Sequence, residues 1–232
     1  MNKNRREVLD KGYVQLIEHM GSDNSVVDAA RVSHKKDSSN FTKEENLKLL
    51  KYLAKHQHWS PFEMVSYKFR VKAPIVVAWQ WVRHRIASYN FESGRYTQYQ
   101  EHEFYTPTSI RKKSLINKQS SEGEIHDNEL FIGRLKDNYE ASYKLYSDIL
   151  ASDGAREIAR LALPAFALYT EFIFSVNLRS LINFLKLRLG KDAQEEIRKY
   201  AEAIYSIIKE VHPELVGAIC EYIEDKTESV QS

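Results

Sequence analysis

The sequence predicts an α+β fold in which a small antiparallel sheet packs with several helices in a single domain. Three segments are strand candidates, two of them because apolar and polar residues alternate with the period of a strand, and they lie among six or seven segments with helical spacing. The length of 232 residues suits one domain and is enough to bury a core without disulfide bonds. We expect the globular domain to span residues 1–220 and a polar tail to span residues 221–232.

The predicted strands are bounded by turn-forming residues. They cover residues 13–19, 65–72 and 166–176. In the second strand, Val, Tyr, Phe and Val alternate with Ser, Lys, Arg and Lys, which is typical of a strand with one buried face.

The predicted helices begin and end at recognisable signals. Thr42 and Glu45 form a capping box at the start of a helix with Leu50 and Ala54 on its apolar face. Further helices, several of them stopped by Gly or Pro, are expected over residues 25–31, 75–82, 129–150, 156–163, 177–189 and 192–211. Ser60, followed by a proline and a glutamate, repeats the start signal just before the second strand. Residues 34–40 and 110–127 are expected to be polar surface loops, the second a candidate lid.

Composition excludes several classes of protein. Lys and Arg number 34 against 32 Asp and Glu, and a net charge of +2 argues against a strongly cationic nucleic-acid binder. The single cysteine excludes a disulfide scaffold and a multi-cysteine zinc site. No apolar run approaches the ~20 residues of a membrane span, and residues 1–10 lack a signal-peptide pattern. We therefore expect a cytoplasmic protein that contacts no membrane.

The densest polar cluster is the segment RHRIASYNFESGRY, residues 83–96, in which Glu92 is the only acid. Arginine presents a planar fork of donors that suits phosphate and carboxylate, and Gly94 permits close backbone approach. The alternative is a solvated basic loop. Because the segment follows an apolar helix containing Trp79 and Trp81, we expect its first residues to face a cleft and bind an anion.

A second polar group lies on the predicted helix 177–189. Arg179 and Asn183 are four residues apart and share a helical face. Taken alone, Asn177 is better explained as an N-cap and Arg188 as a partner of the helix C-terminus. Arg160 likewise fits a solvent-exposed helix end.

The other candidate residues give weaker indications of a functional site. His56 and His58 have no cysteine or carboxylate at ligand spacing, so no metal site is predicted. Cys220 has no basic neighbour that would lower its pKa and is interpreted as a packing residue. The chain lacks the glycine-rich fingerprints of dinucleotide and P-loop folds, so side chains would have to hold any phosphate.

Several ordered blocks of the sequence resemble the flavin-dependent thymidylate synthases. The first is Arg83-His84-Arg85, seven further residues, and then Ser93-Gly94-Arg95-Tyr96. Blocks of the same family lie, along nearly the whole chain, at residues 30–33, 58–63, 73–81, 156–164 and 177–188. Such blocks in order are far more specific than a lone Arg-His-Arg.

This resemblance implies a homotetramer with active sites between subunits that converts dUMP to dTMP. The reaction would use FAD, NADPH and methylenetetrahydrofolate. The implied FAD-binding residues are Ser33, His58, Ser60, Arg83, His84, Arg85, Asn177, Arg179 and Asn183. The implied dUMP-binding residues are Gln80, Arg83, Glu92, Ser93, Gly94, Arg95, Arg160 and Arg188. For Arg160 and Arg188 this reverses the interpretation from the residues alone.

Within the resemblance, Arg188 is expected to stabilise negative charge on the uracil ring, and Ser93 is kept as a second catalytic candidate. Phe91 departs from the family, whose members often carry glutamate there, so a polar contact is lost or moves to Glu92. One extra residue between Pro164 and Tyr169 leaves that turn uncertain. The alternative function is a nucleic-acid-binding module that uses the basic segment 83–95.

Overall fold

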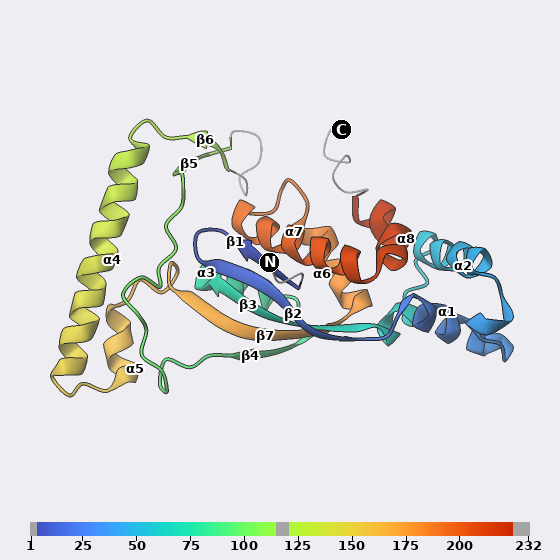
Figure 1. Cartoon of the computed structure of the whole chain (residues 1–232). Helices are drawn as coiled ribbons and strands as arrows, with labels where there is room; N and C mark the ends of the chain where they lie inside the picture. The colour runs from blue at the N-terminus through green and yellow to red at the C-terminus, as the bar shows by residue number, and fades with distance from the viewer. Residues whose placement is uncertain (1–3, 115–120, 225–232) are drawn as a thin grey trace.

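The computed structural model describes residues 4–114 and 121–224, and a five-stranded sheet runs through its centre (Figure 1). The strands, in their order across the sheet, are β1 (Arg5–Val8), β2 (Gly12–Met20), β3 (Ser66–Pro74), β7 (Tyr169–Asn177) and β4 (Ser88–Phe91). Each neighbouring pair is antiparallel. The α+β class is confirmed, and the three predicted strands form the middle of the sheet. The two short edge strands were not predicted.

The helices are α1 (Asp23–Arg31), α2 (Lys43–Lys55), α3 (Ile75–Trp81), α4 (Asn128–Ala151), α5 (Arg156–Ala159), α6 (Leu178–Arg188), α7 (Glu195–Val211) and α8 (Pro213–Glu224). Short 3₁₀ helices cover Val32–His34, Ser38–Asn40, Ser60–Met64 and Arg160–Ala162. Figure 1 shows α6, α7 and α8 along one side of the sheet, α1 and α2 at one end, and α4 with α5 at the other end. Within the described ranges, none of the helices could span a bilayer.

The main core lies between the sheet and helices α6 and α7. Side chains along β3 and β7 alternate between buried and partly exposed, as expected for an antiparallel sheet with one covered face. Phe69 and Phe174 project from these strands to meet Trp81, Phe184 and other buried residues. This packing fixes the ends of α3 and α6 against each other.

A second, smaller hydrophobic cluster joins α4 to the other end of the sheet. It contains Phe104, Tyr139, Tyr146 and Leu168, and an isolated β-bridge pairs Phe104 with Leu168. The segment after β4 is therefore held between the sheet and α4.

Apart from small shifts at the ends of other elements, four boundaries differ from the sequence prediction. The expected loop 110–127 contains the paired strands β5 (Arg111–Lys113) and β6 (Ser121–Glu124), while residues 115–120 lie outside the described residues. The expected helix 156–163 divides into α5 and a 3₁₀ turn. The strand expected from residue 166 begins at Tyr169, because the amides of Ala167 and Leu168 first close a turn on the Pro164 carbonyl.

The fourth difference is at the C-terminus. Helix α8 was not predicted and runs to Glu224, so the tail expected from residue 221 begins inside a helix. Ile223 is buried in the main core, which explains why the helix continues past residue 220. The rest of the predicted tail lies outside the described residues.

Candidate functional site

A cavity of about 540 Å³ opens where the segment after α3 meets α6. Six of the residues predicted from the sequence line it: Arg83, His84, Arg85, Arg179, Asn183 and Arg188. The prediction that the start of the 83–96 segment faces a cleft is confirmed.

The Arg-His-Arg run is shaped by the end of α3. Trp81 is fully buried and terminates the helix, and the His84 amide donates to the Trp81 carbonyl at 3.0 Å. The Tyr89 hydroxyl, from β4, donates to the carbonyls of Trp81 and His84 at 3.2 and 2.8 Å. Backbone hydrogen bonds therefore fix the run and leave the Arg83 and Arg85 side chains exposed beside the cavity.

His84 and Arg188 form the most constrained contact in the cavity. Arg188 Nε donates to His84 Nε2 at 3.0 Å, and the His84 ring packs edge-on against Phe184. A guanidinium offers only donors, so the imidazole is neutral and carries its proton on Nδ1. Burial and the nearby Arg188 charge lower the pKa of His84 to about 4. Burial also lowers the pKa of Arg188.

Helix α6 carries the predicted residues Arg179, Asn183 and Arg188, and the predicted Asn177 precedes it. Asn177 is its N-cap and accepts a hydrogen bond from the Ser180 amide at 2.9 Å, so the capping interpretation describes this side chain. Arg179 pairs with Glu63 of the 3₁₀ helix Ser60–Met64 at 2.5 Å. Arg188 is in the last turn of α6, as the C-terminal interpretation expects, and its guanidinium also reaches His84 and the Gln80 carbonyl, 3.5 Å away.

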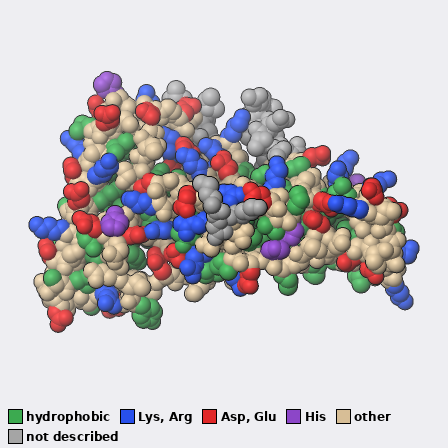
Figure 2. All heavy atoms as spheres, viewed as in Figure 1, with side chains coloured by type: hydrophobic (Ala, Val, Ile, Leu, Met, Phe, Trp, Pro, Cys, Tyr) green, Lys and Arg blue, Asp and Glu red, His purple; other side chains and the backbone are tan. Residues whose placement is uncertain are grey.

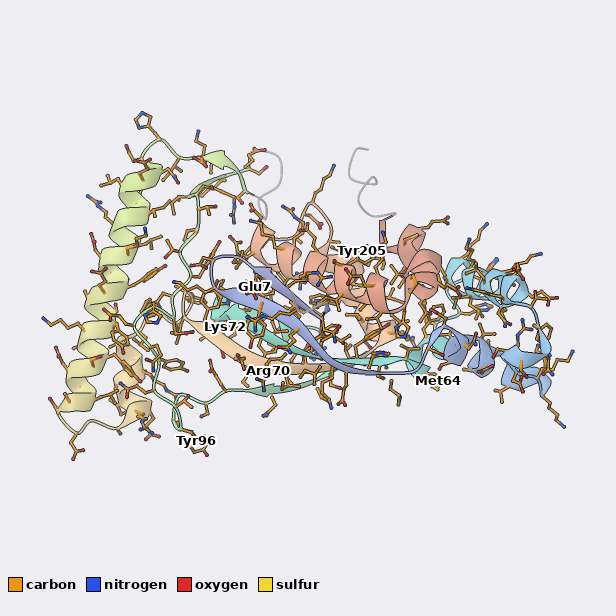
Figure 3. All side chains as sticks on the ribbon, viewed as in Figure 1. Glu7, Met64, Arg70, Lys72, Tyr96 and Tyr205 are labelled. Carbon is orange, nitrogen blue, oxygen red and sulfur yellow. The ribbon has the colours of Figure 1, made fainter. Side chains whose placement is uncertain are left out.

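The remaining nucleotide candidates do not line this cavity: Gln80 is on α3, Arg160 follows α5, and the others lie on the segment after β4. The Ser93 carbonyl accepts from the amides of Tyr96 and Thr97 at 2.9 and 3.1 Å, which makes a tight turn. A Cβ at Gly94 would lie 2.6 Å from the Tyr99 ring, so a larger residue there would require that ring to move. Arg95 is exposed, and the Tyr96 side chain points away from the sheet near α5 (Figure 3).

Arg160 belongs to this second group. It is exposed at the end of α5, and its Nε donates to the Glu157 carbonyl at 3.3 Å. The neighbouring Arg156 donates to the Tyr96 carbonyl at 3.2 Å and so ties α5 to the loop. Within one chain the nucleotide candidates other than Gln80 therefore form two groups, one at the cavity and one on this loop with the end of α5.

Residues 91 and 92 take different roles in β4 and just after it. The Phe91 ring stacks on Phe172 with centroids 4.6 Å apart. Glu92 extends the pairing with β7: its amide donates to the Glu171 carbonyl at 2.9 Å, and its carboxylate accepts from the Glu171 amide at 3.0 Å. One Glu92 oxygen is thus engaged by the backbone.

Three further flavin candidates do not line the cavity. Ser33 is exposed and donates to the Ala30 carbonyl at 2.9 Å. His58 is exposed with its ring edge-on to Tyr52. Ser60 is exposed too, next in the chain to Trp59, which does line the cavity.

Four aromatic residues line the cavity, Trp59, Phe174, Phe184 and Tyr222, and none of them was predicted as a site residue. Trp59 and Tyr222 line the cavity with ring centroids 4.7 Å apart, and Lys186 Nζ lies 3.4 Å from the Tyr222 ring centre. Tyr222 falls within the predicted tail, and no local signal links it to residue 59. Among the described residues, no cluster of His, Cys, Asp and Glu could hold a metal ion.

The cavity can bind an anionic ligand that also has a flat apolar part. Arg83, Arg85 and Arg179 supply guanidinium donors, and Trp59 and Phe184 supply aromatic surface. On the face drawn in Figure 2, acidic and basic side chains are interspersed, unlike the continuous basic area of a nucleic-acid binder.

Comparisons with known proteins agree with this chemistry. The family model described as thymidylate synthase complementing protein matches residues 15–214. A flavin-dependent thymidylate synthase of Thermus thermophilus is 48% identical over 216 residues, covering 93% of this chain and 78% of that protein. One from Pseudothermotoga lettingae is 42% identical over 207 residues, 89% of each chain.

A solved structure is also similar over most of its length. It is the UMP/dUMP methylase PolB from Streptomyces cacaoi, bound with 5-Br UMP. Its TM-score is 0.81 at 31% identity, with 93% of this chain and 96% of that chain covered.

Proposed function

The chain belongs to the flavin-dependent thymidylate synthase family of methyltransferases, and from that premise we propose that it converts dUMP to dTMP. Methylenetetrahydrofolate would supply the carbon, and NADPH would supply the electrons through FAD. The observation that carries the proposal is the cavity itself, where the Arg-His-Arg run meets Arg188.

The cavity residues fit a flavin dinucleotide. Its diphosphate needs donors, and in a chain without a glycine-rich phosphate loop Arg83, Arg85 and Arg179 offer them. Asn183 and Ser180 add polar groups on α6, and Trp59 offers a face to a flat ring. FAD, when bound, supplies hydride chemistry.

Arg188 is the residue we assign to the pyrimidine. Its guanidinium stays charged and is oriented by neutral His84, so it can stabilise negative charge on a uracil ring without losing a proton. Ser93, in the turn after β4, is assigned to substrate positioning, with Gly94 and Arg95 beside it as phosphate ligands.

A thiol nucleophile is not part of this proposal. The one cysteine of the chain, Cys220, is on α8 and donates to the Gly217 carbonyl at 3.2 Å. Its neighbours in the sequence include no basic residue that would stabilise a thiolate.

The two groups of candidates suggest how an assembly would complete the site. Arg188 lines the cavity and Gln80 lies beside Arg188, while Ser93, Arg95 and Arg160 lie on the loop and at the end of α5. We propose a homotetramer in which the loop of one subunit reaches the cavity of another, so that both groups contact one dUMP.

An anaerobic assay tests the reaction. Protein with reduced flavin is mixed with dUMP and methylenetetrahydrofolate, and dTMP formation and flavin reoxidation are followed together. We expect both to require dUMP. FAD-loaded protein that forms no dTMP, or apoprotein that binds single-stranded nucleic acid and no FAD, contradicts the proposal.

Arg85→Ala tests the flavin assignment. Removal of one charge-assisted hydrogen bond to a phosphate costs about 1.5–3 kcal/mol, so FAD content after purification should fall well below that of the parent. The matched control is Arg198→Ala on α7, whose guanidinium makes a 3.9 Å pair with Glu202. Full FAD occupancy in folded Arg85→Ala removes this residue from the flavin site.

A further inference from the structure

A buried carboxylate that the proposed mechanism does not use lies at the start of α7. Glu196 is 3% exposed and is surrounded by donors. Arg111 Nη2 donates to both of its oxygens at 2.7 and 2.9 Å, and the Tyr105 hydroxyl donates at 3.0 Å. Gln194 Nε2 donates to Oε2 at 2.8 Å.

Glu196 is ionised at neutral pH. Burial alone would raise its pKa, but the hydrogen bonds from Arg111 and Gln194 outweigh burial and hold the pKa below its ordinary value. Arg111 is fixed in turn, because its Nη1 lies 3.3 Å from a Glu195 oxygen and its Nε donates to Ser121 of β6 at 2.8 Å. The Glu196 side chain is thus a carboxylate, which accepts hydrogen bonds and donates none.

This acceptor determines the orientation of two side-chain amides in series. Gln194 must turn its NH₂ group to Glu196, which leaves its carbonyl oxygen facing Gln80. That oxygen accepts from Gln80 Nε2. Gln80 Oε1 is consequently directed away from Gln194, and among residues 4–114 and 121–224 it receives no hydrogen bond.

Gln80 lies next to Arg188, which lines the cavity. Its backbone carbonyl is 3.5 Å from Arg188 Nη2, so the end of the amide series lies beside the residue assigned to the pyrimidine. The series runs from the β5–β6 pair through the start of α7 to the end of α3, three parts of the chain that are distant in sequence.

We propose that Glu196 is a positioning residue that, through Gln194, fixes the Gln80 amide so that its carbonyl oxygen is presented to the nucleotide. The inference rests on the proposed function in one respect, that Gln80 contacts dUMP. The orientation of the amides themselves does not depend on that contact.

Glu196→Gln tests the orientation with an almost isosteric change. The new amide keeps its oxygen toward Arg111 and Tyr105, and its NH₂ group then meets the NH₂ group of Gln194. Gln194 turns over and Gln80 follows, so Gln80 presents N–H where it presented oxygen. We expect the Kd of the FAD-loaded protein for dUMP to rise about threefold to tenfold, the effect of one hydrogen bond.

The matched control is Glu195→Gln. Glu195 is the preceding residue and also pairs with Arg111, at 3.3 Å, but it is not a hydrogen-bond partner of Gln194. The Kd of the Glu195→Gln protein for dUMP should equal that of the parent. An equal rise in both variants would assign the effect to the Arg111 pair and overturn the proposal.

Exchange of the two side chains provides a rescue. In Glu196→Gln with Gln194→Glu, the carboxylate at 194 accepts from the amide at 196 and from Gln80 Nε2, so Gln80 returns to its original orientation with the net charge unchanged. The double variant should recover most of the dUMP affinity. A folded double variant that binds no better than Glu196→Gln alone overturns the proposal.

A measurement without nucleotide separates this inference from the proposed function. Gln80→Ala and Glu196→Gln are combined in a double-mutant cycle, and the urea midpoint of each protein is measured. Side chains 80 and 196 are linked through Gln194, so we expect the midpoint shifts to be non-additive. Additive shifts contradict the linkage of Glu196 to Gln80 through Gln194. If the parent fails to bind dUMP while the shifts are non-additive, this linkage stands and the proposed function is wrong.

Discussion

At the scale of single residues, the pair of His84 and Arg188 shows how the fold sets a protonation state. A histidine beside an arginine would ordinarily remain exposed and titrate near neutral pH. Here Phe184 and the end of α3 partly bury the ring, and the guanidinium needs an acceptor, so the imidazole is held neutral. The Arg-His-Arg motif indicates a site, but it does not indicate that its histidine acts as an acceptor.

This arrangement predicts a stability loss on acidification. The folded-state pKa of His84 is about 4, below its ordinary value of 6.5, so the unfolded chain takes up the proton first as pH falls. The contribution of neutral His84 to the free energy of unfolding is fully present above pH 6.5 and disappears as the pH falls to about 4. Between pH 7 and pH 5 we expect a loss of about 1 kcal/mol from this group, after a discount for its partial exposure.

Urea unfolding at pH 7 and pH 5 measures the loss. His84→Gln keeps an acceptor for Arg188 but cannot titrate, so its stability should depend less on pH by that amount. The control is His126→Gln, because the His126 side chain is 99% exposed. Equal pH dependence in the parent and His84→Gln would contradict a depressed pKa.

At the scale of elements, the sequence was most informative where a pattern was local. The Thr42 and Glu45 capping box is present with both hydrogen bonds, at 3.2 and 2.8 Å. Strands β3 and β7 followed from alternation. Strand β4 did not, because only four residues pair and its exposed Ser88 and Asn90 resemble a loop.

The candidate site, like the fold, could be predicted only where its residues form a local pattern or motif. The residue pattern indicated an anion site at residues 83–85, and the family resemblance added Arg179 and Arg188, but no local pattern encodes that Trp59 and Tyr222 would meet. The same holds for Glu92, whose engagement with Glu171 depends on strand pairing across 79 positions. Contacts between distant elements arise from packing of the whole core.

Gly12, at the start of β2, gives an element-scale prediction. A Cβ there would lie 1.9 Å from the Tyr200 hydroxyl and 2.7 Å from the Lys72 carbonyl, the two groups that hydrogen-bond at 2.7 Å. Gly12→Ala should therefore cost about 1–3 kcal/mol of unfolding free energy through overpacking. Chemical denaturation measures the change.

Gly133 in α4 is the matched control, because nothing lies within 4 Å of a Cβ added there. Gly133→Ala should stabilise the protein by about 0.5–1 kcal/mol, since glycine is unfavourable within a helix. Equal effects of the two substitutions would mean that the packing of Tyr200 and Lys72 does not require glycine at position 12.

At the scale of the whole molecule, the division of the candidates into two groups makes the assembly testable. If one chain supplies Arg85 and Arg188 while another supplies Ser93 and Arg95, single-site variants of the two groups should complement each other. Arg95→Ala and Arg188→Ala are each expected to be nearly inactive. Co-expressed in one cell, they should regain about one quarter of the parent activity, the share of sites in which both contributing chains are intact.

The control for this experiment combines two variants of the same group, Arg85→Ala and Arg188→Ala. Every cavity in that mixture carries one of the two defects, so co-expression should restore no activity. If the Arg95 and Arg188 mixture also fails to recover, each site is formed within one chain.

The separate hydrophobic cluster under α4 also has a consequence for local unfolding. Helix α4 packs on α5 and the 3₁₀ turn Arg160–Ala162 rather than on the main core, and Tyr143 and Tyr146 bond to the backbone of Tyr99. Transient opening of this unit can therefore precede global unfolding, and its amides should exchange with solvent faster than those of α7.

Because the opening unit includes the loop that carries Ser93 and Arg95, any ligand that binds this loop only in its closed form must suppress the opening. At a dUMP concentration of about 100 times Kd, linkage limits the added protection to about 2.7 kcal/mol. Deuterium uptake across α4 should thus be slower with dUMP than without it, although none of the proposed dUMP-binding residues is on that helix. Uptake in α4 that dUMP leaves unchanged would show that the loop and the helix open independently.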